Sequence, residues 1–212
     1  MKLLSVNVGG PREVKWQGRS VRTSIFKAAV DGPVHVAKLN LDGDEQSDLA
    51  VHGGVDKAVY LYPSEHYPFW RERFPNLQLG WAALGENLTT EGILEQTTNI
   101  GDRFGIGTAE FVVTQPRMPC YKLGIRFGDA SAIKMLLQSG RTGFYFSVSK
   151  EGTITAGDPI RLLEQDNRHV SVTDIVELYS GATRNTDLLA LATELPSLPL
   201  SWRDYFRRHL TG

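Results

Sequence analysis

The chain of 212 residues contains a single cysteine and no long run of apolar residues. One cysteine cannot form a disulfide within the chain, and it cannot hold an iron–sulfur cluster, which needs several thiolates. The apolar runs fall short of the roughly 18–20 residues that cross a bilayer, and the run over residues 1–7 is too short for a signal peptide. These absences favour a protein of the reducing cytoplasm that does not enter a membrane.

An excess of charge of one sign is also lacking. The 23 lysines and arginines nearly balance the 24 aspartates and glutamates, and the formal net charge is −1. Such a chain has no general electrostatic reason to bind a nucleic acid polymer or an acidic membrane. The sequence also has no P-loop, no GxGxxG dinucleotide fingerprint after a strand and no GxSxG nucleophile motif.

Short apolar runs separated by glycines predict strands through the first two-thirds of the chain. They lie at residues 3–8, 21–26, 34–41, 58–62, 111–113, 144–148 and 160–163. Helices do not alternate regularly with these runs, so the pattern indicates a mainly β or α+β fold with a β-barrel-like domain. Two inserted helices are predicted, one from Ser64 and one between Asp129 and Gly140.

The pattern changes after about Gln165. Residues 166–169 are polar and resemble a linker, and three short helical patterns follow. Thr173, then Asn185 or Thr186, and Ser201 with Asp204 are predicted to cap these helices. The sequence therefore predicts a β-rich domain over residues 1–165 and a small, separable three-helix domain over residues 166–212.

Cys120 lies in the segment QPRMPCYK, directly after a predicted strand. Pro116 and Pro119 stiffen the approach to the cysteine, and the neighbouring cations Arg117 and Lys122 favour its thiolate form. A stiff loop with a reactive thiolate suits a metal ligand or a nucleophile. A buried structural cysteine is the alternative, because cysteine is among the most buried residue types.

A second candidate is the segment from His52 through Gly53, Gly54 and Lys57 into a predicted strand. Paired glycines let backbone N–H groups approach an anion, and Lys57 adds a positive charge, so the segment suits a phosphate. An ordinary tight loop with a solvated lysine is the alternative.

Asn87, in GENLTTEG, offers a donor and an acceptor for the amide edge of a pterin, although the same residues also favour a plain turn. The acidic segment over residues 42–48 lacks the spacing of an EF-hand. We therefore expect that segment to be a solvated loop.

Four segments together resemble the MOSC-domain family, in its bacterial YiiM type. They are GDEQSDLAVHGGVDKAVYLYP (43–63), GENLTTEG (85–92), IGDRFGIGTAEFVVTQPRMPC (100–120) and SGRTGFYFSVSKEGTITAGDPI (139–160). The C-terminal helical patterns are similar to the small helical domain of that type. The resemblance covers nearly the whole chain, and the cysteine and HGG segments are specific in combination.

The resemblance implies a β-barrel-like fold that binds the molybdenum cofactor, a molybdopterin, with Cys120 as the protein ligand of the metal. It implies that His52, Gly53, Gly54, Lys57 and Arg117 lie in the cofactor pocket and that Asn87 lies nearby. It also implies a reductase of small N-hydroxylated compounds, such as hydroxylaminopurine-type base analogues. Such an enzyme has a detoxifying role.

Three other functions remain open at this point. Cys120 is the sulfur carrier in the first, the chain stores or delivers the cofactor in the second, and Cys120 reacts with peroxide in the third. For the reductase, the missing dinucleotide, haem and iron–sulfur motifs predict that a separate reductase or redox carrier supplies electrons. A homodimer is compatible with the sequence.

Overall fold

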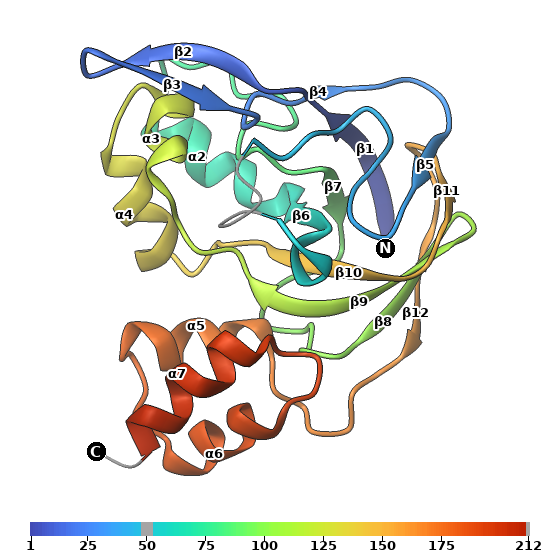
Figure 1. The fold of residues 1–212 in the computed structure, drawn as a ribbon, viewed down its shortest axis with the longest axis vertical. Coiled ribbons are helices and arrows are strands. Elements are labelled where there is room, and N and C mark those ends of the chain that lie inside the picture. Colours follow the sequence, from blue (N-terminus) through green and yellow to red (C-terminus); the bar gives the residue numbers. More distant parts are fainter. Residues whose placement is uncertain (48–52, 211–212) are drawn as a thin grey trace.

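The structure is a computed structural model that describes residues 1–47 and 53–210. Its elements in chain order are β1 (Lys2–Val8), β2 (Arg12–Trp16), β3 (Arg19–Thr23), β4 (Ala28–Ala29), β5 (Val34–Val36), the 3₁₀ turn η1 (Val55–Lys57), β6 (Val59–Pro63), the 3₁₀ turn η2 (Ser64–His66), α2 (Tyr67–Arg73), β7 (Leu88–Glu91), β8 (Arg103–Ile106), β9 (Ala109–Pro116), α3 (Tyr121–Phe127), α4 (Ser131–Gln138), β10 (Phe144–Lys150), β11 (Gly152–Ile154), β12 (Ile160–Glu164), α5 (Val172–Ser180), α6 (Thr186–Glu194) and α7 (Leu200–Leu210). Figure 1 shows the barrel strands with α2, α3 and α4 at one side and α5, α6 and α7 below. Among the described residues, no helix is long and apolar enough to span a membrane.

Eight strands form one sheet in the order β12-β8-β9-β10-β6-β7-β1-β4. Only β6 and β7 pair in parallel within it, so the sheet is mixed. The segment that leads into β12 returns to β1: Leu3 N donates to Asp158 O and Ile160 N donates to Met1 O, each at 3.0 Å. These bonds bring the two sides of the sheet together, so the domain has the expected barrel-like form.

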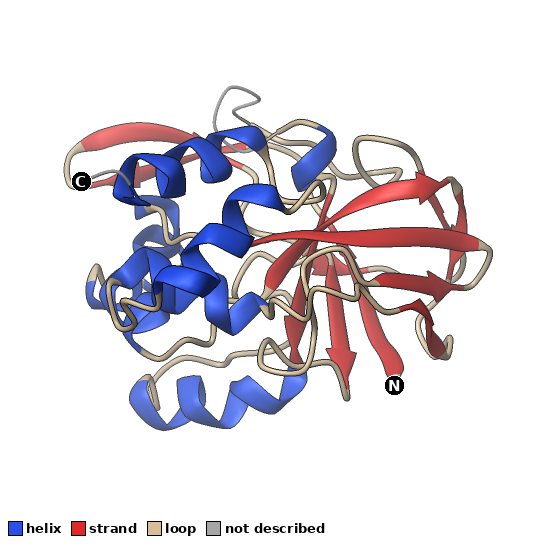
Figure 2. Cartoon of the chain, turned by 90° about the horizontal axis from the view of Figure 1, so that it is seen from below, coloured by secondary structure: helices blue, strands red, loops and turns tan. Residues whose placement is uncertain are grey.

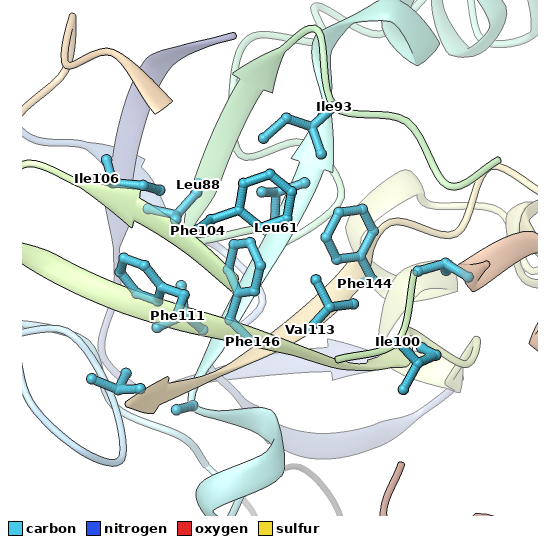
Figure 3. Close-up of a cluster of buried hydrophobic side chains, with 14 of the residues drawn as sticks. Leu61, Leu88, Ile93, Ile100, Phe104, Ile106, Phe111, Val113, Phe144 and Phe146 are labelled. Atoms are coloured by element: carbon cyan, nitrogen blue, oxygen red, sulfur yellow. The ribbon is translucent and has the colours of Figure 1, made fainter. Parts of the chain in front are cut away.

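Aromatic side chains fill the inside of the barrel (Figure 3). Along β10, Phe144 and Phe146 are buried while Tyr145 between them is half-buried, which is the alternation of a strand with one inward face. The ring of Phe146 lies 5.2 Å from that of Phe111 and 5.9 Å from that of Phe104. The strand predicted at residues 144–148 is therefore a core strand.

Figure 2 shows helices gathered on one side of the strands. A second apolar cluster contains side chains from α2, α3, α4 and β6. Trp70 of α2 and Phe74, the residue that follows α2, pack against Phe127 of α3 at ring distances of 5.3 and 4.9 Å. The helices predicted from Ser64 and after Asp129 correspond to η2 with α2 and to α4. The sequence did not predict α3, which begins directly after Cys120.

The C-terminal helices share one hydrophobic core with the barrel. Ile175, Trp202 and Phe206 belong to the same buried cluster as the barrel phenylalanines. Backbone hydrogen bonds also join the two parts: Ile100 N donates to Val170 O, and Val172 N donates to Thr98 O, each at 2.9 Å. The division near residue 165 stays a prediction, but this continuous core does not favour two independently folding pieces.

Two strand predictions need correction. Of residues 34–41, only Val34–Val36 form a strand, because Ala37 N bonds back to Asn40 O and turns the chain. The strand predicted at residues 21–26 is Arg19–Thr23, paired with β2 in a separate hairpin.

Two helix caps were also predicted wrongly. Ser171, not Thr173, caps α5 through a capping box with Asp174. Helix α7 begins at Leu200, so Ser201 lies inside it and is not its cap. Asn185 does cap α6, accepting from the N–H groups of Asp187 and Leu188.

Candidate functional site

Cys120 stands at the joint between β9 and α3. It has extended backbone geometry (φ −130°, ψ 162°), and its carbonyl accepts from Leu123 N at 3.0 Å, which starts the helix. The preceding turn is tied to the barrel because Arg117 N donates to Gly143 O at 3.1 Å. Cys120 is half-buried and lies where two clefts meet.

We call these the inner and the outer cleft. They share Lys57, Met118, Cys120 and Tyr145. The inner cleft is further lined by Thr23, Ser24, Ile25, Lys27, Glu45, Gln46, Ser47, Tyr60, Leu84, Gly85, Asn87, Arg117 and Lys122. The outer cleft is further lined by Gln115, Pro116, Pro119, Tyr179, Ser201, Trp202, Tyr205 and Arg208.

The inner cleft is positively charged. Four of its lining residues are lysine or arginine, whereas only one of them, Glu45, has a carboxylate. Lys122 is buried and donates to Ser47 Oγ at 3.0 Å. Several cations held away from bulk water attract an anionic ligand more strongly than surface cations do, since solvent screens them less.

Two polar atoms in the inner cleft, Ser24 Oγ and Arg117 Nη1, are buried and have no hydrogen-bond partner among the described residues. Leaving such groups unpaired is costly, so each needs a partner that the described residues do not supply. Burial acts to lower the pKa of Arg117, but nearby Tyr60, Cys120 and Tyr145 outweigh it, and the pKa is raised. The guanidinium is therefore a permanent, buried cation that faces the cleft.

Asp44 and Asn87 form a buried network behind the inner cleft. Asp44 pairs with Lys27, accepts from Gly9 N at 2.9 Å and accepts from Asn87 Nδ2 at 3.0 Å. The expectation of a solvated loop over residues 42–48 is therefore wrong for Asp44, which is buried because it neutralises Lys27. Burial lowers the pKa of Lys27, and the Asp44 charge opposes that shift.

The side-chain amide of Asn87 is fully engaged within the protein. Its Oδ1 accepts from Tyr60 N at 3.1 Å, and its Nδ2 also donates to Asn7 O at 3.3 Å. Asn87 precedes strand β7, which the turn interpretation of this segment missed. Asn87 lines the cleft, but its side-chain hydrogen bonds hold Asp44 and β6 in place.

The HGG segment divides into three parts in the structure. His52 lies outside the described residues. Gly53 and Gly54 are described but line neither cleft. Gly54 has φ 100°, a conformation that favours glycine, and leads into η1, which carries Lys57 to the shared wall of both clefts. Burial lowers the pKa of Lys57.

The outer cleft is aromatic. Tyr179 of α5 and Trp202 and Tyr205 of α7 line it, and the Tyr179 ring lies 5.3 Å from Trp202 and 5.2 Å from Tyr205. No aspartate or glutamate is among its described lining residues. Of the arginines of α7, Arg208 alone lines this cleft.

A chain of hydrogen bonds links the outer cleft to η1. Trp202 Nε1 donates to Gln115 Oε1 at 2.7 Å, and Gln115 Nε2 donates to Asp56 O at 3.2 Å. Thr114 Oγ1 donates to the same carbonyl at 2.7 Å. Helix α7, strand β9 and the residue before Lys57 are thereby held in one fixed arrangement.

Sequence reasoning missed several lining residues, including Ser24, Lys27, Tyr60 and Tyr145. Ser24 and Lys27 lie outside every motif, whereas Tyr60 and Tyr145 lie within the family segments but have the pattern of ordinary strand residues. Trp202 and Tyr205 follow helical spacing and therefore resembled ordinary core residues. Among the described residues, no group of three or more His, Cys, Asp or Glu side chains is arranged to hold a metal ion.

Comparison with known proteins agrees with this barrel and its helical appendage. The MOSC domain model matches residues 48–161, and the model of the YiiM-like three-helix domain matches residues 170–212. The chain belongs to the MOSC-domain family, a family associated with the molybdenum cofactor. Its second matched domain assigns it to the YiiM-like members of that family.

Three relatives illustrate the similarity. Protein YiiM of Escherichia coli is 40% identical over 193 residues, which cover 90% of this chain and 86% of that protein. The crystal structure of YiiM from Geobacillus stearothermophilus has a TM-score of 0.83 at 35% identity and covers 99% of this chain and 98% of that one. A protein named reductase from Gibberella moniliformis is 36% identical over 186 residues, 86% of this chain but only 33% of that longer protein.

Proposed function

We propose that this protein is a molybdenum-cofactor-dependent reductase of small N-hydroxylated compounds, with Cys120 as the protein ligand of the metal. One observation carries the proposal: Cys120 lies where a cationic cleft and an aromatic cleft meet. The family membership and the name of the Gibberella relative support an oxidoreductase role.

The described residues of the inner cleft fit the cofactor. Its phosphate and its polar pterin offer the acceptors that Arg117 Nη1 and Ser24 Oγ lack. Lys57 and Lys122 supply further positive charge, whereas Lys27 is neutralised by Asp44 and Asn87 positions that network rather than the ligand. A thiolate such as that of Cys120 is the soft ligand that this kind of metal centre takes. When bound, the cofactor supplies two-electron redox chemistry.

The protein contributes orientation and protons. Removing the oxygen of R–NH–OH consumes two electrons and two protons and yields R–NH₂ and water. Lys57 lines both clefts, and burial lowers its pKa, so it gives up a proton more readily than an exposed lysine does. We assign proton delivery to Lys57. A separate reductase or small redox carrier supplies the electrons, since the chain has no nicotinamide or flavin fingerprint.

The deciding experiment compares protein made in cells that synthesise molybdopterin with protein made in cells that cannot. Purified protein from the first source is expected to contain about one molybdenum per chain and to reduce N-hydroxylated compounds with an artificial electron donor. Protein from the second source should contain no molybdenum and be inactive. Retained molybdenum without turnover would instead indicate a storage or delivery protein, and a persulfide on Cys120 without molybdenum would indicate a sulfur carrier.

A further inference from the structure

The outer cleft contains aromatic side chains that the chemistry at Cys120 does not require. Tyr179 is 38% exposed, and Tyr205 is half-buried, although both belong to the small helical domain, where large rings would ordinarily be buried. Leu178, the neighbour of Tyr179, packs against the hydrophobic core. An exposed tyrosine beside an already packed core is thus available to contact something else.

The aromatic wall is fixed in place before any ligand arrives. Trp202 is 8% exposed and is held by its hydrogen bond to Gln115, a residue of the strand that leads to Cys120. The Tyr179 ring contacts the Trp202 ring, and the Tyr205 ring contacts that of Tyr179 at an angle of 36°. A wall with this little freedom loses little conformational entropy when it binds a flat ring.

The charges of the cleft limit what it accepts. Lys57 and Arg208 are its only charged lining residues among those described, and both are cationic. A cationic compound would find no carboxylate to pair with in the described lining. An uncharged flat ring finds tyrosine and tryptophan rings with which it can stack or pack edge-to-face.

We propose that the outer cleft is the subsite for the ring of the substrate. An uncharged aromatic N-hydroxylated compound lies with its ring against Tyr179 and Tyr205 and its N–O group toward Cys120 and Lys57. The three-helix domain thereby determines substrate specificity, a role that neither the barrel nor the cofactor site supplies. This inference rests on the proposed function for the identity of the reacting group, but not for the binding of the ring.

A kinetic test uses the holoenzyme with an artificial electron donor and two substrates. Phenylhydroxylamine has a ring, and N-methylhydroxylamine has none. Tyr179→Ala is expected to raise KM for phenylhydroxylamine about tenfold, with kcat within about twofold, because a stacked ring contact is lost. It should leave kcat/KM for N-methylhydroxylamine unchanged, and Tyr179→Phe should restore the native KM.

The matched control is Leu191→Ala on α6. Leu191 belongs to the same helical domain and is 44% exposed but does not line the outer cleft. This variant should leave both substrates unaffected. Equal losses on the two substrates in Tyr179→Ala, or an unchanged KM for phenylhydroxylamine, would overturn the subsite.

A binding test separates this inference from the proposed function. Aniline, the product of phenylhydroxylamine reduction, should change the fluorescence of Trp202, and Trp202→Phe should remove that change. Tyr179→Ala should weaken aniline binding about tenfold. If aniline binds in this way but no N-hydroxylated compound is reduced, the subsite stands and the reductase proposal fails. If reduction occurs but aniline binding does not depend on Tyr179, the subsite is wrong.

Discussion

The inner and the outer cleft meet at Cys120 but are lined by different kinds of side chain. The inner cleft presents buried cations and two polar atoms for which the described residues supply no hydrogen-bond partner. The outer cleft presents aromatic rings from α5 and α7 and no described carboxylate. Buried charge retains a charged group tightly, whereas aromatic walls select by shape with little charge dependence. Under the proposed function, this difference assigns cofactor retention to the inner cleft and substrate choice to the outer cleft.

Removing residues 166–212 should have the largest effect, because it deletes the outer cleft and uncovers the core. Burial of side chains such as Ile175, Trp202 and Phe206 contributes about 1.5–3 kcal/mol each, so the loss should reach several kcal/mol. Thermal unfolding and gel filtration of the shortened chain should show a marginal or aggregating barrel. An unchanged Tm would show instead that residues 1–165 fold independently, as the sequence alone predicted.

Replacing Cys120, which lies where the two clefts meet, should abolish the reductase activity without unfolding the protein. Cys120→Ser should reduce N-hydroxyl reduction by more than about a hundredfold, since even residues that support metal ligands typically contribute about 10–100-fold. Molybdenum content and circular dichroism, measured together, check that the loss is local. Full activity with bound molybdenum would disprove the ligand assignment.

Lys57 lies in both clefts, so its replacement tests whether the shared wall delivers protons. In the native enzyme, kcat should fall as pH rises through the lowered pKa of Lys57, because only the protonated amine donates. Lys57→Arg keeps the charge but hardly releases a proton, so kcat should drop by about a hundredfold with molybdenum content retained. Lys150→Arg, at an exposed end of β10, is the control. A native pH profile in Lys57→Arg would exclude proton delivery by Lys57.

Replacing Arg117 should change the stability of the protein and its cofactor retention in opposite directions, because Arg117 lines the inner cleft only. Arg117→Met removes a buried cation with an unpaired nitrogen, so cofactor-free protein should become about 1 kcal/mol more stable, or roughly 2–4 °C in Tm. The same change should weaken cofactor retention by about tenfold or more, since a charged hydrogen bond contributes roughly 1.5–3 kcal/mol. Arg168→Met, which removes an arginine paired with Asp166, should not raise Tm. Destabilised cofactor-free protein would mean that Arg117 supports the fold and not the ligand.

The sequence predicts the barrel strands best where one face is buried. Residues 144–148 alternate because β10 has a core side, and residues 58–62 form a compact run because all of β6 is buried. The sequence predicts burial poorly where it depends on residues far apart in the chain. Asp44 is an example, because its burial depends on Lys27 and Asn87. No local pattern encodes that pairing.

Some residues of the candidate site could be predicted from local sequence patterns, and others could not. Cys120, Arg117 and Lys57 stand out because prolines, glycines and flanking cations mark their segments, and the structure places all three on the inner cleft. Tyr179 and Tyr205 were not singled out, because an aromatic residue in a helix has the same spacing whether it faces a core or a cleft. Only the packing of α5 and α7 against β9 distinguishes these cases.

The contact between residues 1–3 and residues 157–160 has a consequence for how the chain folds. The barrel closes only when Leu3 and Met1 bond to Asp158 and Ile160, so the first strand must wait for a segment more than 150 residues away. Loop closure over such a distance is slow compared with local helix formation. During synthesis the start of β1 therefore lacks its partners at this seam until residues 157–160 emerge, although β4 and β7 pair with β1 elsewhere. Refolding should accordingly be slow and sensitive to protein concentration, with closure of this seam among the last events.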